Sequence, residues 1–371
     1  MSKRILIVSV KAGAGHVKAA DALEEAFKNN KNCVVKNVEL LEYAKTFVKY
    51  FYGKAVVDVA KNSPEIYGYF YKNYNLLKEF IKPKFLIDNL YLQSFLEMVD
   101  DFKPDVIICT HYFPADILAY YRKQANKNYK ITLIITDYEH HPAWLIKDID
   151  LYCVAHEEIK KNLIYTNIPE NQILVFGIPI GLQFSKPLNK EVLKRKYGLD
   201  NDELTLLISA GSFGISPVSE IIQKLSDIKK HFQMIVICGH SQDQFLKLNK
   251  LKQKELRIKK VFGFVNNMEE LMAVSDLLIT KPGGITVSES LAMALPMLLI
   301  KPIPGQEEAN ADYLLEHGVG QKAYNLDSLI YKTENLIQNK KELLKMSQKA
   351  KKISKPNASS DIVTEILKKW G

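Results

Sequence analysis

Short apolar runs alternate with longer amphipathic stretches along almost the whole chain. The run Arg4–Val10, for example, is apolar and rich in β-branched residues, and a stretch with helical character, Val17–Asn29, follows it. Such an alternation is typical of parallel αβ sheets. The pattern therefore predicts the α/β fold class. The other expected strands are Cys33–Val38, Asp105–Cys109, Lys130–Ile135, Leu151–Val154, Ile173–Phe176, Thr205–Ser209, Met234–Cys238, Lys259–Phe262, Leu277–Thr280 and Met297–Ile300.

The length of the chain and one loop-like stretch indicate two domains. A chain of 371 residues exceeds one typical domain, and its 47% hydrophobic and 25% charged residues are ordinary for a globular protein. The segment Gly177–Gly181 contains two glycines and a proline, and a stretch rich in Lys, Pro and Asn follows it. We therefore expect a first domain over residues 1–181, a second over 182–354, and a C-terminal helix within 355–371.

The stretch from Ile279 to Asn310 carries the strongest functional signal. It reads as a strand, a glycine turn, a helix, a second strand and a polar loop. The turn Pro282–Gly284 presents free backbone N–H groups and a positive helix end, which suit a diphosphate, although the turn alone would also fit an ordinary αβ unit. Glu289, in the helix, can accept two hydrogen bonds from a ribose, and the loop Pro304–Asn310 can bind sugar hydroxyls. Together these features indicate a nucleotide-sugar.

The string TKPGGITVSES, followed by PGQEEAN, resembles the donor-binding region of the bacterial processive diacylglycerol β-glucosyltransferases. It is similar, less closely, to plant monogalactosyldiacylglycerol synthases and to the peptidoglycan UDP-N-acetylglucosamine transferase that makes lipid II. The resemblance covers nearly the full length and indicates glycosyltransferase family 28. It implies the GT-B architecture, in which two Rossmann-like domains with parallel sheets face each other across a cleft. In that family the last helix, here roughly Ser359–Trp370, crosses back to the first domain.

The resemblance also implies a binding site for a UDP-hexose in the second domain. The glycine-rich segment Ala210–Gly214 would meet the phosphates from the side opposite the Pro282–Gly284 turn, with Gly239–His240 nearby. The segment Phe264–Met268 matches the one whose backbone reads the uracil edge in the family; its alternative is an ordinary strand-to-helix core. The expected donor-binding residues are Gly15, Gly211, Ser212, Phe213, His240, Phe264, Val265, Met268, Gly283, Gly284, Ile285, Thr286, Glu289, Gln306, Glu307 and Asn310.

The segment Gly13–His16 follows the first strand and precedes a helix. A dinucleotide-binding fingerprint would need a third glycine where this chain has Lys18. The resembled family has a GxGH pattern here, with the histidine facing the cleft at the helix N-terminus. There the helix field lowers the pKa of the imidazole and favours its neutral, proton-accepting form. His16 is therefore expected to be the general base, the alternative being a histidine that caps the helix or is merely exposed.

Asp137 is a second candidate for the catalytic chemistry. It follows the buried strand Lys130–Ile135 and so lies at a carboxyl end, where αβ proteins form their sites. In the related lipid glycosyltransferases a TD…W string occupies this place near the acceptor, which here corresponds to Thr136, Asp137 and Trp144. Asp137 would orient His16 or take the acceptor proton itself; its alternative role is a helix N-cap.

No metal is expected. The histidines His140, His141 and His156, and the DxD pair Asp148 and Asp150, are types that can bind one. The DxD pair, however, precedes a strand instead of following one. The resemblance implies that helix dipoles and loop N–H groups take the place of a metal. The expected site thus has no metal and no other cofactor.

The chain shows no sign of export or membrane insertion. No apolar run approaches the ~20 residues that a spanning helix needs, and Ile5–Val10 is too short for a signal peptide. The four cysteines have no CxxC spacing, which suits reduced thiols in buried strands. We therefore expect a cytoplasmic protein.

The segment Ala44–Phe95 predicts contact with a membrane surface. It combines many aromatic residues with eight lysines and four acidic residues, and the net charge of the whole chain is +9. Aromatic side chains with lysines suit an interface with anionic headgroups, whereas no sequence signature supports nucleic acid as the partner. The alternative is an apolar face that packs on the domain's own sheet. The residues expected at the acceptor or membrane surface are Trp144, Phe47, Phe51, Lys45, Lys49, Lys82 and Lys84.

Together these observations predict an inverting, metal-independent glycosyltransferase that moves a hexose from a UDP-sugar to 1,2-diacylglycerol. It would work peripherally on the inner face of the cell membrane, with anionic lipid as a potential activator. Three alternatives remain at this stage: transfer of UDP-N-acetylglucosamine to a polyprenyl-linked lipid, a UDP-sugar 2-epimerase, and a non-catalytic nucleotide-sugar sensor. The choice between glucose and galactose stays open.

Overall fold

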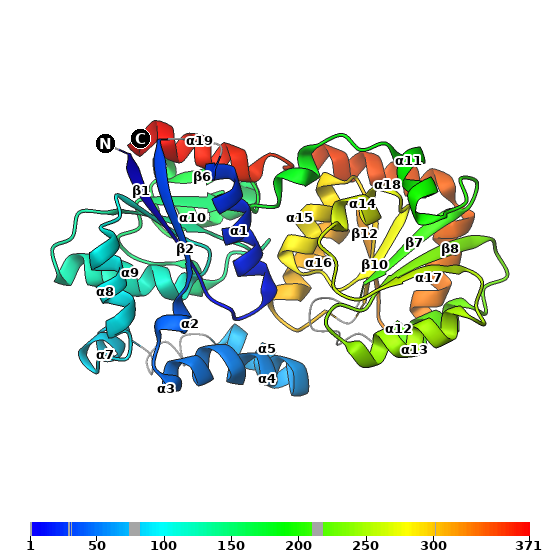
Figure 1. Cartoon of the computed structure of the whole chain (residues 1–371), viewed down its shortest axis with the longest axis horizontal. Helices are drawn as coiled ribbons and strands as arrows, with labels where there is room; N and C mark the ends of the chain where they lie inside the picture. Colours follow the sequence, from blue (N-terminus) through cyan, green and yellow to red (C-terminus); the bar gives the residue numbers. More distant parts are fainter. Residues whose placement is uncertain (1, 29, 31, 74–81, 210–217, 301) are drawn as a thin grey trace. The chain divides into compact units, whose positions relative to one another are not determined.

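A computed structural model describes residues 2–28, 30, 32–73, 82–209, 218–300 and 302–371. The chain divides into two compact units. The first comprises Met1–Leu182, Ile303–Gln306 and Asn357–Gly371, and the second comprises Gln183–Pro302 and Glu307–Pro356. Each unit is built around its own parallel sheet (Figure 1).

The described strands of the first sheet lie in the order β2-β1-β3-β4-β5-β6, and every neighbouring pair is parallel. Apolar runs make the central strands: Ile5 to Val8 of β1 are at most 1% exposed, and all of β3 is buried. This fits the near-continuous apolar runs of a parallel sheet that is covered on both faces. The strands are β1 (Lys3–Ser9), β2 (Cys33–Glu39), β3 (Val106–Cys109), β4 (Lys130–Ile134), β5 (Leu151–Val154) and β6 (Ile173–Val175).

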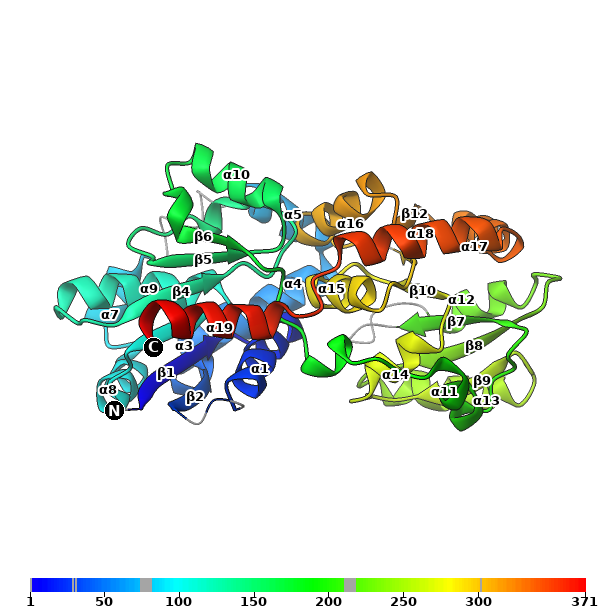
Figure 2. The same ribbon diagram turned by 90° about the horizontal axis from the view of Figure 1, so that it is seen from above.

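The first helix, α1 (Ala14–Lys28), and the last, α19 (Ala358–Trp370), pack together on one face of this sheet (Figure 2). Their apolar residues share one core with β1, β3 and β4. At the start of α19, Ser359 Oγ donates a hydrogen bond to the carbonyl O of Ile180 at 2.6 Å, which fixes this end of the helix to the first unit. The other helical segments of this unit are α2 (Leu40–Tyr43), α3 (Thr46–Val48), η1 (Lys49–Ala55), α4 (Val56–Asn62), α5 (Pro64–Lys72), α7 (Pro83–Asp88), α8 (Gln93–Phe102), α9 (Tyr112–Gln124), η2 (Pro142–Trp144), α10 (Glu157–Tyr165) and η3 (Glu170–Gln172).

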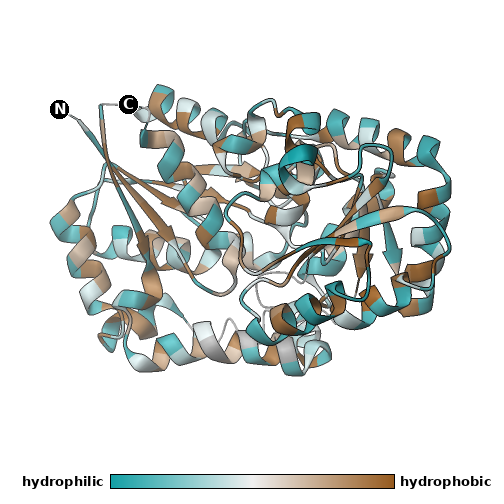
Figure 3. Ribbon diagram, turned by 45° about the vertical axis from the view of Figure 1, so that its right-hand side comes forward, coloured by the Kyte–Doolittle hydropathy of each residue, from teal (hydrophilic) through white to brown (hydrophobic). Residues whose placement is uncertain are grey.

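The described strands of the second sheet lie in the order β12-β11-β10-β7-β8-β9 and are also parallel. The central strands of both sheets are among the most hydrophobic parts of the chain (Figure 3). The strands are β7 (Leu204–Ser209), β8 (Phe232–Ile237), β9 (Ile258–Phe262), β10 (Leu277–Thr280), β11 (Met297–Ile300) and β12 (Gly320–Ala323). The helical segments are η4 (Leu182–Ser185), α11 (Lys190–Tyr197), α12 (Val218–Leu225), α13 (Gln242–Lys252), α14 (Met268–Ala273), α15 (Gly284–Ala292), α16 (Gln306–Glu316), α17 (Leu326–Gln338) and α18 (Lys340–Ile353).

The predicted strands are confirmed, with boundaries that shift by a residue or two, and one strand was missed. β12 has the sequence GQKA, and only Gly320 and Ala323 in it are buried. It pairs with β11 alone at the edge of the sheet. An edge strand without an apolar run shows no alternation of hydrophobic and polar residues in the sequence. Its backbone hydrogen bonds to the neighbouring strand, and not the burial of its side chains, keep it in the sheet.

Candidate active site

Three strands that are neighbours in the first sheet, β1, β3 and β4, end at the same edge, as strands of a parallel sheet must. His16 lies in the first turn of α1, after the loop that leaves β1, and that loop turns at Gly13 with a φ of 151°. Thr110 follows β3, and Thr136 follows β4. The structure brings these three residues into contact.

His16 is held by both threonines. Its Nδ1 lies 2.9 Å from the carbonyl O of Thr110 and 2.9 Å from Oγ1 of Thr136. Thr110 Oγ1 in turn donates to the carbonyl O of His16 at 2.9 Å. Because a carbonyl oxygen can only accept, the contact with Thr110 assigns the hydrogen of the neutral ring to Nδ1. Nε2 therefore keeps the lone pair that can accept a proton.

The pKa of His16 is lowered to about 4, because burial of the ring disfavours its charged form more than the hydrogen bond to Thr110 favours it. The direction agrees with the sequence-based expectation. The largest cause is burial of the ring.

Sequence reasoning missed His111 as a neighbour of His16. Its ring lies edge-on, with its centroid 4.5 Å from that of His16, and burial together with His16 lowers its pKa well below the usual value. His111 caps α9, since its Nδ1 accepts from Phe113 N at 3.1 Å. Thr110 and His111 follow β3 just as Asp137 follows β4, so the rule that singled out Asp137 would have found them.

Asp137 is 4% exposed and lies directly after Thr136. Its carboxylate accepts hydrogen bonds from the Gln306 side chain and from the Trp144 indole. Burial nevertheless raises its pKa to about 7, because those hydrogen bonds offset the desolvation only in part. The same charge contributes, after burial, to the raised pKa of Tyr112, about 12.

Asp137 does not cap a helix. The short helix η2 begins after His141, whose Nδ1 accepts from Ala143 N at 3.2 Å and so takes the capping role. Asp137 also makes no hydrogen bond to His16 within the described part of the chain; Thr136 makes that contact instead. The N-cap alternative is thus wrong, and direct orientation of His16 by Asp137 finds no support.

The segment Ile303–Gln306, which groups with the first unit, packs against α5. A Cβ added to Gly305 would lie 2.6 Å from the Tyr71 ring, and one added to Gly68 would lie 2.6 Å from Pro304. Both glycines are therefore required by close approach. Tyr71 also reaches the loop that carries Asp137: its hydroxyl donates to Glu139 at 3.3 Å, and its carbonyl accepts from His141 Nε2 at 2.8 Å.

In the second unit, the expected phosphate turn leads into α15. Gly283 is the N-cap residue, and apart from its neighbours in the chain no atom of the described residues lies within 4 Å of a Cβ added to it, so a ligand can approach the backbone there. Gly284 and Ile285 are buried in the first turn, and Thr286 is half-buried. Glu289 lies further along the same helix and is 6% exposed.

Asn310 of α16 supports this turn. It is fully buried, and its Nδ2 donates to the carbonyl O of Pro282 at 3.0 Å. We expected Gln306, Glu307 and Asn310 to bind the hexose. In the structure the amide of Gln306 contacts Asp137 and an amide hydrogen of Asn310 contacts the turn, while Glu307 is half-buried. The binding of a hexose by these residues stays a prediction.

His240 and Phe264 come together in the second unit. Their rings stack with centroids 4.5 Å apart and an interplanar angle of 12°, and Phe264 is 49% exposed. They follow β8 and β9, neighbours in the sheet, so the stack forms a flat surface at a carboxyl edge. Val265 is half-buried beside it, and Met268 begins α14. The expected residues Gly211, Ser212 and Phe213 lie outside the described residues.

The segment from Ala44 to Phe95 splits its apolar residues between two environments. Ala44 and Val48 are buried, whereas Phe47 and Phe51 are 56% and 39% exposed. These four residues therefore do not share one buried face, and the π-helical turn η1 begins among them, at Lys49. Among the described residues, no helix is long and apolar enough to cross a membrane.

Three exposed aromatic residues, Phe47, Phe51 and Phe85, form one cluster with the half-buried Tyr91. Phe47 stacks with Phe51 at 6.2 Å and contacts Tyr91 at 5.5 Å, and Tyr91 contacts Phe85 at 5.8 Å, measured between ring centroids. Trp144, in contrast, is 2% exposed and cannot belong to an exposed surface. The residues Lys45, Lys49, Lys82 and Lys84 are exposed in the same segment. We call the four rings and these four lysines the aromatic-lysine surface.

Two of the candidate metal ligands, Asp150 and His156, have other partners. Asp150 pairs with Arg122 and, at 3.2 Å, with Lys130; burial alone would raise its pKa, but these partners and the amide of Ile131 lower it. His156 binds the carbonyl O of Tyr138 at 3.0 Å. The described residues contain no group of three or more His, Cys, Asp or Glu side chains that could hold a metal ion.

Two Rossmann-like αβ units, each with its own parallel sheet, and a glycine turn before α15 are the features of the GT-B fold. Solved structures share this fold. The MurG structure from Acinetobacter baumannii has a TM-score of 0.64 and 17% identity, and the match covers 99% of both chains. The UDP-GlcNAc 2-epimerase from Neisseria meningitidis, bound to UDP-GlcNAc, has a TM-score of 0.60 and 15% identity over 98% of this chain and 100% of its own.

The sequence comparisons show the family. Residues 16–180 match the monogalactosyldiacylglycerol (MGDG) synthase family, and residues 205–364 match the glycosyltransferase family 28 C-terminal domain. The processive diacylglycerol beta-glucosyltransferase of Bacillus cereus is 32% identical over 370 residues, which cover 98% of this chain and 93% of that protein. The chain therefore belongs to the family of processive diacylglycerol β-glucosyltransferases.

Proposed function

We propose that the protein transfers a hexose from a UDP-sugar to 1,2-diacylglycerol at a membrane surface. The anomeric carbon is inverted, and the products are a β-glycosyldiacylglycerol and UDP. The printed names of the curated relatives support the lipid acceptor and the β product. The observation that carries the proposal is the orientation of His16, whose Nδ1 is fixed by Thr110 so that Nε2 can accept a proton.

In this reaction the acceptor hydroxyl loses its proton to His16 Nε2 as its oxygen attacks the anomeric carbon, and the bond to the diphosphate breaks on the opposite side. Ionised Asp137 assists by favouring the imidazolium that forms. The pKa of Asp137, about 7, suits this role because the carboxylate is available near neutral pH. Burial disfavours the charged form of His16, so a nearby negative charge that stabilises the imidazolium would help this residue to accept the proton.

The donor binds to the second unit. The N–H groups at the start of α15 and the positive end of that helix meet the diphosphate and stabilise the charge that develops on it. Glu289 accepts hydrogen bonds from the ribose. The His240–Phe264 stack and the backbone near Val265 hold the uracil. No metal takes part in this scheme.

The aromatic-lysine surface brings the protein to the membrane. Phe47, Phe51 and Phe85 are exposed apolar side chains beside several exposed lysines, a composition suited to an interface rich in anionic lipids. Because these residues lie within the first unit, the same unit would bind the membrane and receive the lipid acceptor. The protein would then act as a peripheral enzyme on the cytoplasmic face.

The test is a product analysis. The protein is incubated with UDP-glucose or UDP-galactose and diacylglycerol in anionic vesicles, and the lipids are analysed for glycosyldiacylglycerol and its anomeric configuration. The β-anomer from one of the two donors is the expected product. An α-anomer would contradict inversion, and glycosylation of a polyprenyl-linked lipid alone would contradict the acceptor.

A further inference from the structure

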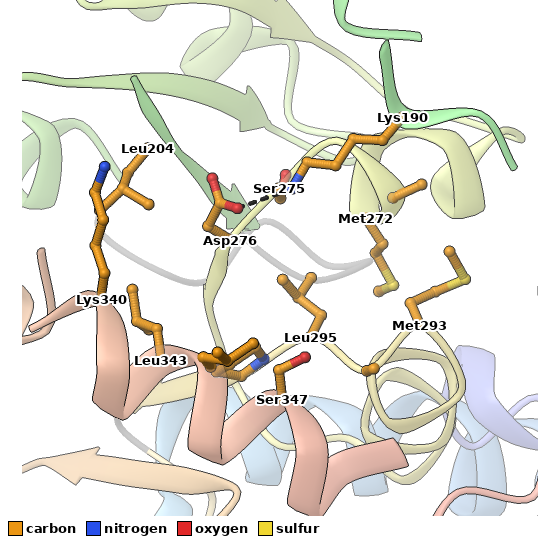
Figure 4. A pocket seen from close by; sticks show the side chains of 14 residues that line it. Lys190, Leu204, Met272, Ser275, Asp276, Met293, Leu295, Lys340, Leu343 and Ser347 are labelled. Carbon is orange, nitrogen blue, oxygen red and sulfur yellow. Dashed lines mark hydrogen bonds and ion pairs between the residues drawn. The ribbon is translucent and has the colours of Figure 1, made fainter. Parts of the chain in front are cut away.

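The second unit contains a cavity of about 440 Å³ at the amino ends of β7, β10 and β11 (Figure 4). The glycine turn of the proposed donor site follows the carboxyl end of β10, so the cavity lies at the opposite edge of the same sheet. Its volume is within the ~300–1,000 Å³ of small-molecule sites. The reaction proposed above makes no use of it.

One helix supplies a complete wall of this cavity. The residues Lys340, Leu343, Leu344 and Ser347 of α18 line it, and their spacing places them on one face of the helix. Leu343 is 6% exposed, whereas Leu344 is 59% exposed, so the wall runs from the interior to an open mouth.

The remaining lining is mainly apolar and contains flexible side chains. Met272, from α14, and Met293, just after α15, lie near each other on one side (Figure 4). Leu204, Leu295 and Pro296 also line the space. The methionine side chain is flexible and can adapt to a ligand that adopts several conformations, and an unbranched alkyl chain is such a ligand.

The polar groups leave one positive charge unmatched. Lys190 pairs with Asp276 at 2.8 Å, and the other oxygen of Asp276 accepts from the amide of Thr205 at 2.8 Å. The charges of Lys190 and Asp276 therefore cancel. Lys340 is exposed, and within the described part of the chain its ammonium makes no ion pair. An anionic group at the mouth would complement it.

We propose that this cavity binds a single-chain amphiphile whose alkyl chain enters between Met272, Met293 and Leu343 and whose one anionic group meets Lys340. A fatty carboxylate and an alkyl phosphate monoester share this chemistry. The proposal concerns binding alone and does not depend on glycosyl transfer.

Calorimetric titration of the full-length protein with decanoate, at low salt and below the concentration at which the probe forms micelles, tests this site. One saturable site per chain is expected. Decyl phosphate and decanol serve as further probes. Of the two anions, decanoate and decyl phosphate, the one with the higher affinity identifies the preferred headgroup. Decanol has no charge and should bind about five-fold more weakly than decanoate, because it loses one partly exposed charge contact. Equal affinity for decanol would overturn the role of Lys340.

Two filling variants and one charge variant locate the site. Ser347→Phe and Ala273→Leu occupy the cavity from two different helices and should each weaken binding about ten-fold or more. Lys340→Gln should weaken the anions about five-fold, whereas Lys341→Gln, an exposed lysine outside the lining, should have no effect. Thermal unfolding checks that each variant is folded. Unchanged affinity in both filling variants, or the absence of saturable binding to the wild type, would overturn the proposal.

The aromatic-lysine surface also combines exposed apolar rings with lysines, so it needs its own control. A variant with Lys45, Lys49, Lys82 and Lys84 changed to Gln should keep the full decanoate affinity. Loss of binding in that variant would place the amphiphile on the first unit and overturn the cavity assignment. The measurement needs neither UDP-sugar nor diacylglycerol, so its outcome is separate from that of the proposed reaction.

Discussion

Burial acts in opposite directions on the two proposed catalytic residues. It lowers the pKa of His16 to about 4 and raises that of Asp137 to about 7. Each shift favours the neutral form of the group, as expected in a site of low polarity. At pH 7 the imidazole is therefore neutral, whereas Asp137 is close to half ionised. A change of pH near neutrality acts on Asp137 first.

This difference predicts the pH dependence of the reaction. Because the carboxylate exists above its pKa, kcat/KM should fall as the pH decreases through about 7. The Asp137→Asn variant should be less active. In that variant the fall of kcat/KM on the acidic side of the pH profile, its acid limb, should move toward pH 4, because His16 is then the group that titrates. His16→Ala should lower turnover about 100-fold with UDP affinity unchanged, and His231→Ala, an exposed histidine, is the control. An unchanged acid limb in Asp137→Asn would show that another group sets it.

Glu289 offers a test of donor binding. It is buried on α15, beyond the glycine turn, and its carboxylate can accept hydrogen bonds from both ribose hydroxyls. Glu289→Ala should weaken UDP binding by roughly 1.5–3 kcal/mol, the size of charge-assisted hydrogen bonds. Calorimetry with UDP measures this, with Glu316→Ala, an exposed residue of α16, as the control. Wild-type affinity in the Glu289 variant would rule out its contact with the ribose.

Among the elements, the strands were predictable and the partners of individual loop residues were not. Apolar runs mark strands such as β3 and β10 because both faces are buried. The pairing of Asn310 with Pro282, or of Gln306 with Asp137, joins residues 28 and 169 positions apart. No local pattern encodes such contacts. The sequence therefore predicts candidate loops, whereas the contacts of Gln306 and Asn310 are visible only in the structure.

The C-terminal end of α15 holds a strained residue. Ala294 has a φ of 52°, and the hydrogen bonds Ala294 N to Leu291 O and Leu295 N to Ser290 O form a Schellman motif, in which glycine is preferred at this place. The left-handed conformation costs an alanine ~1–2 kcal/mol, and Ala294→Gly removes this strain. Glycine also makes the unfolded chain more flexible, which offsets part of the gain, so the net stabilisation should be about 0.5–1 kcal/mol. Denaturant unfolding measures this difference, and Ala292→Gly, at the last residue of the helix, is expected to destabilise. A loss of stability in Ala294→Gly would refute the strain.

The aromatic-lysine surface predicts a salt-dependent attachment to membranes. Each lysine near an anionic membrane contributes ~1 kcal/mol that salt attenuates, whereas insertion of rings such as Phe47 is largely insensitive to salt. Replacing Lys45, Lys49, Lys82 and Lys84 with Gln should weaken sedimentation with anionic vesicles strongly at low salt and little at high salt. The matched control changes the exposed lysines 229, 230, 341 and 345 of the second unit to Gln. Equal binding of both variants at low salt would place the membrane contact elsewhere.

At the scale of the whole molecule, the two units divide the proposed work. The first carries the exposed rings together with His16 and Asp137, and the second carries the glycine turn and the ring stack for the nucleotide. The net charge of +9 favours an anionic partner for the chain as a whole. Transfer from a diphosphate also needs positive potential at the leaving group, which a metal or the protein must supply.

The ion pairs of Asp150 make the protein the expected source of that potential. Asp150 is engaged by Arg122 and Lys130, while the start of α15 presents backbone N–H groups beside the open space at Gly283. Prolonged treatment with EDTA, followed by assay in metal-free buffer, should therefore leave turnover within about two-fold of the untreated enzyme, since removing a metal that stabilises the leaving group would cost several kcal/mol. A larger loss that manganese restores would return Asp148 and Asp150 to consideration. The variant Asp150→Asn separates the two cases. If Asp150 only forms structural ion pairs, the variant should be less stable but keep its turnover per folded molecule. If Asp150 binds a metal, the variant should lose turnover.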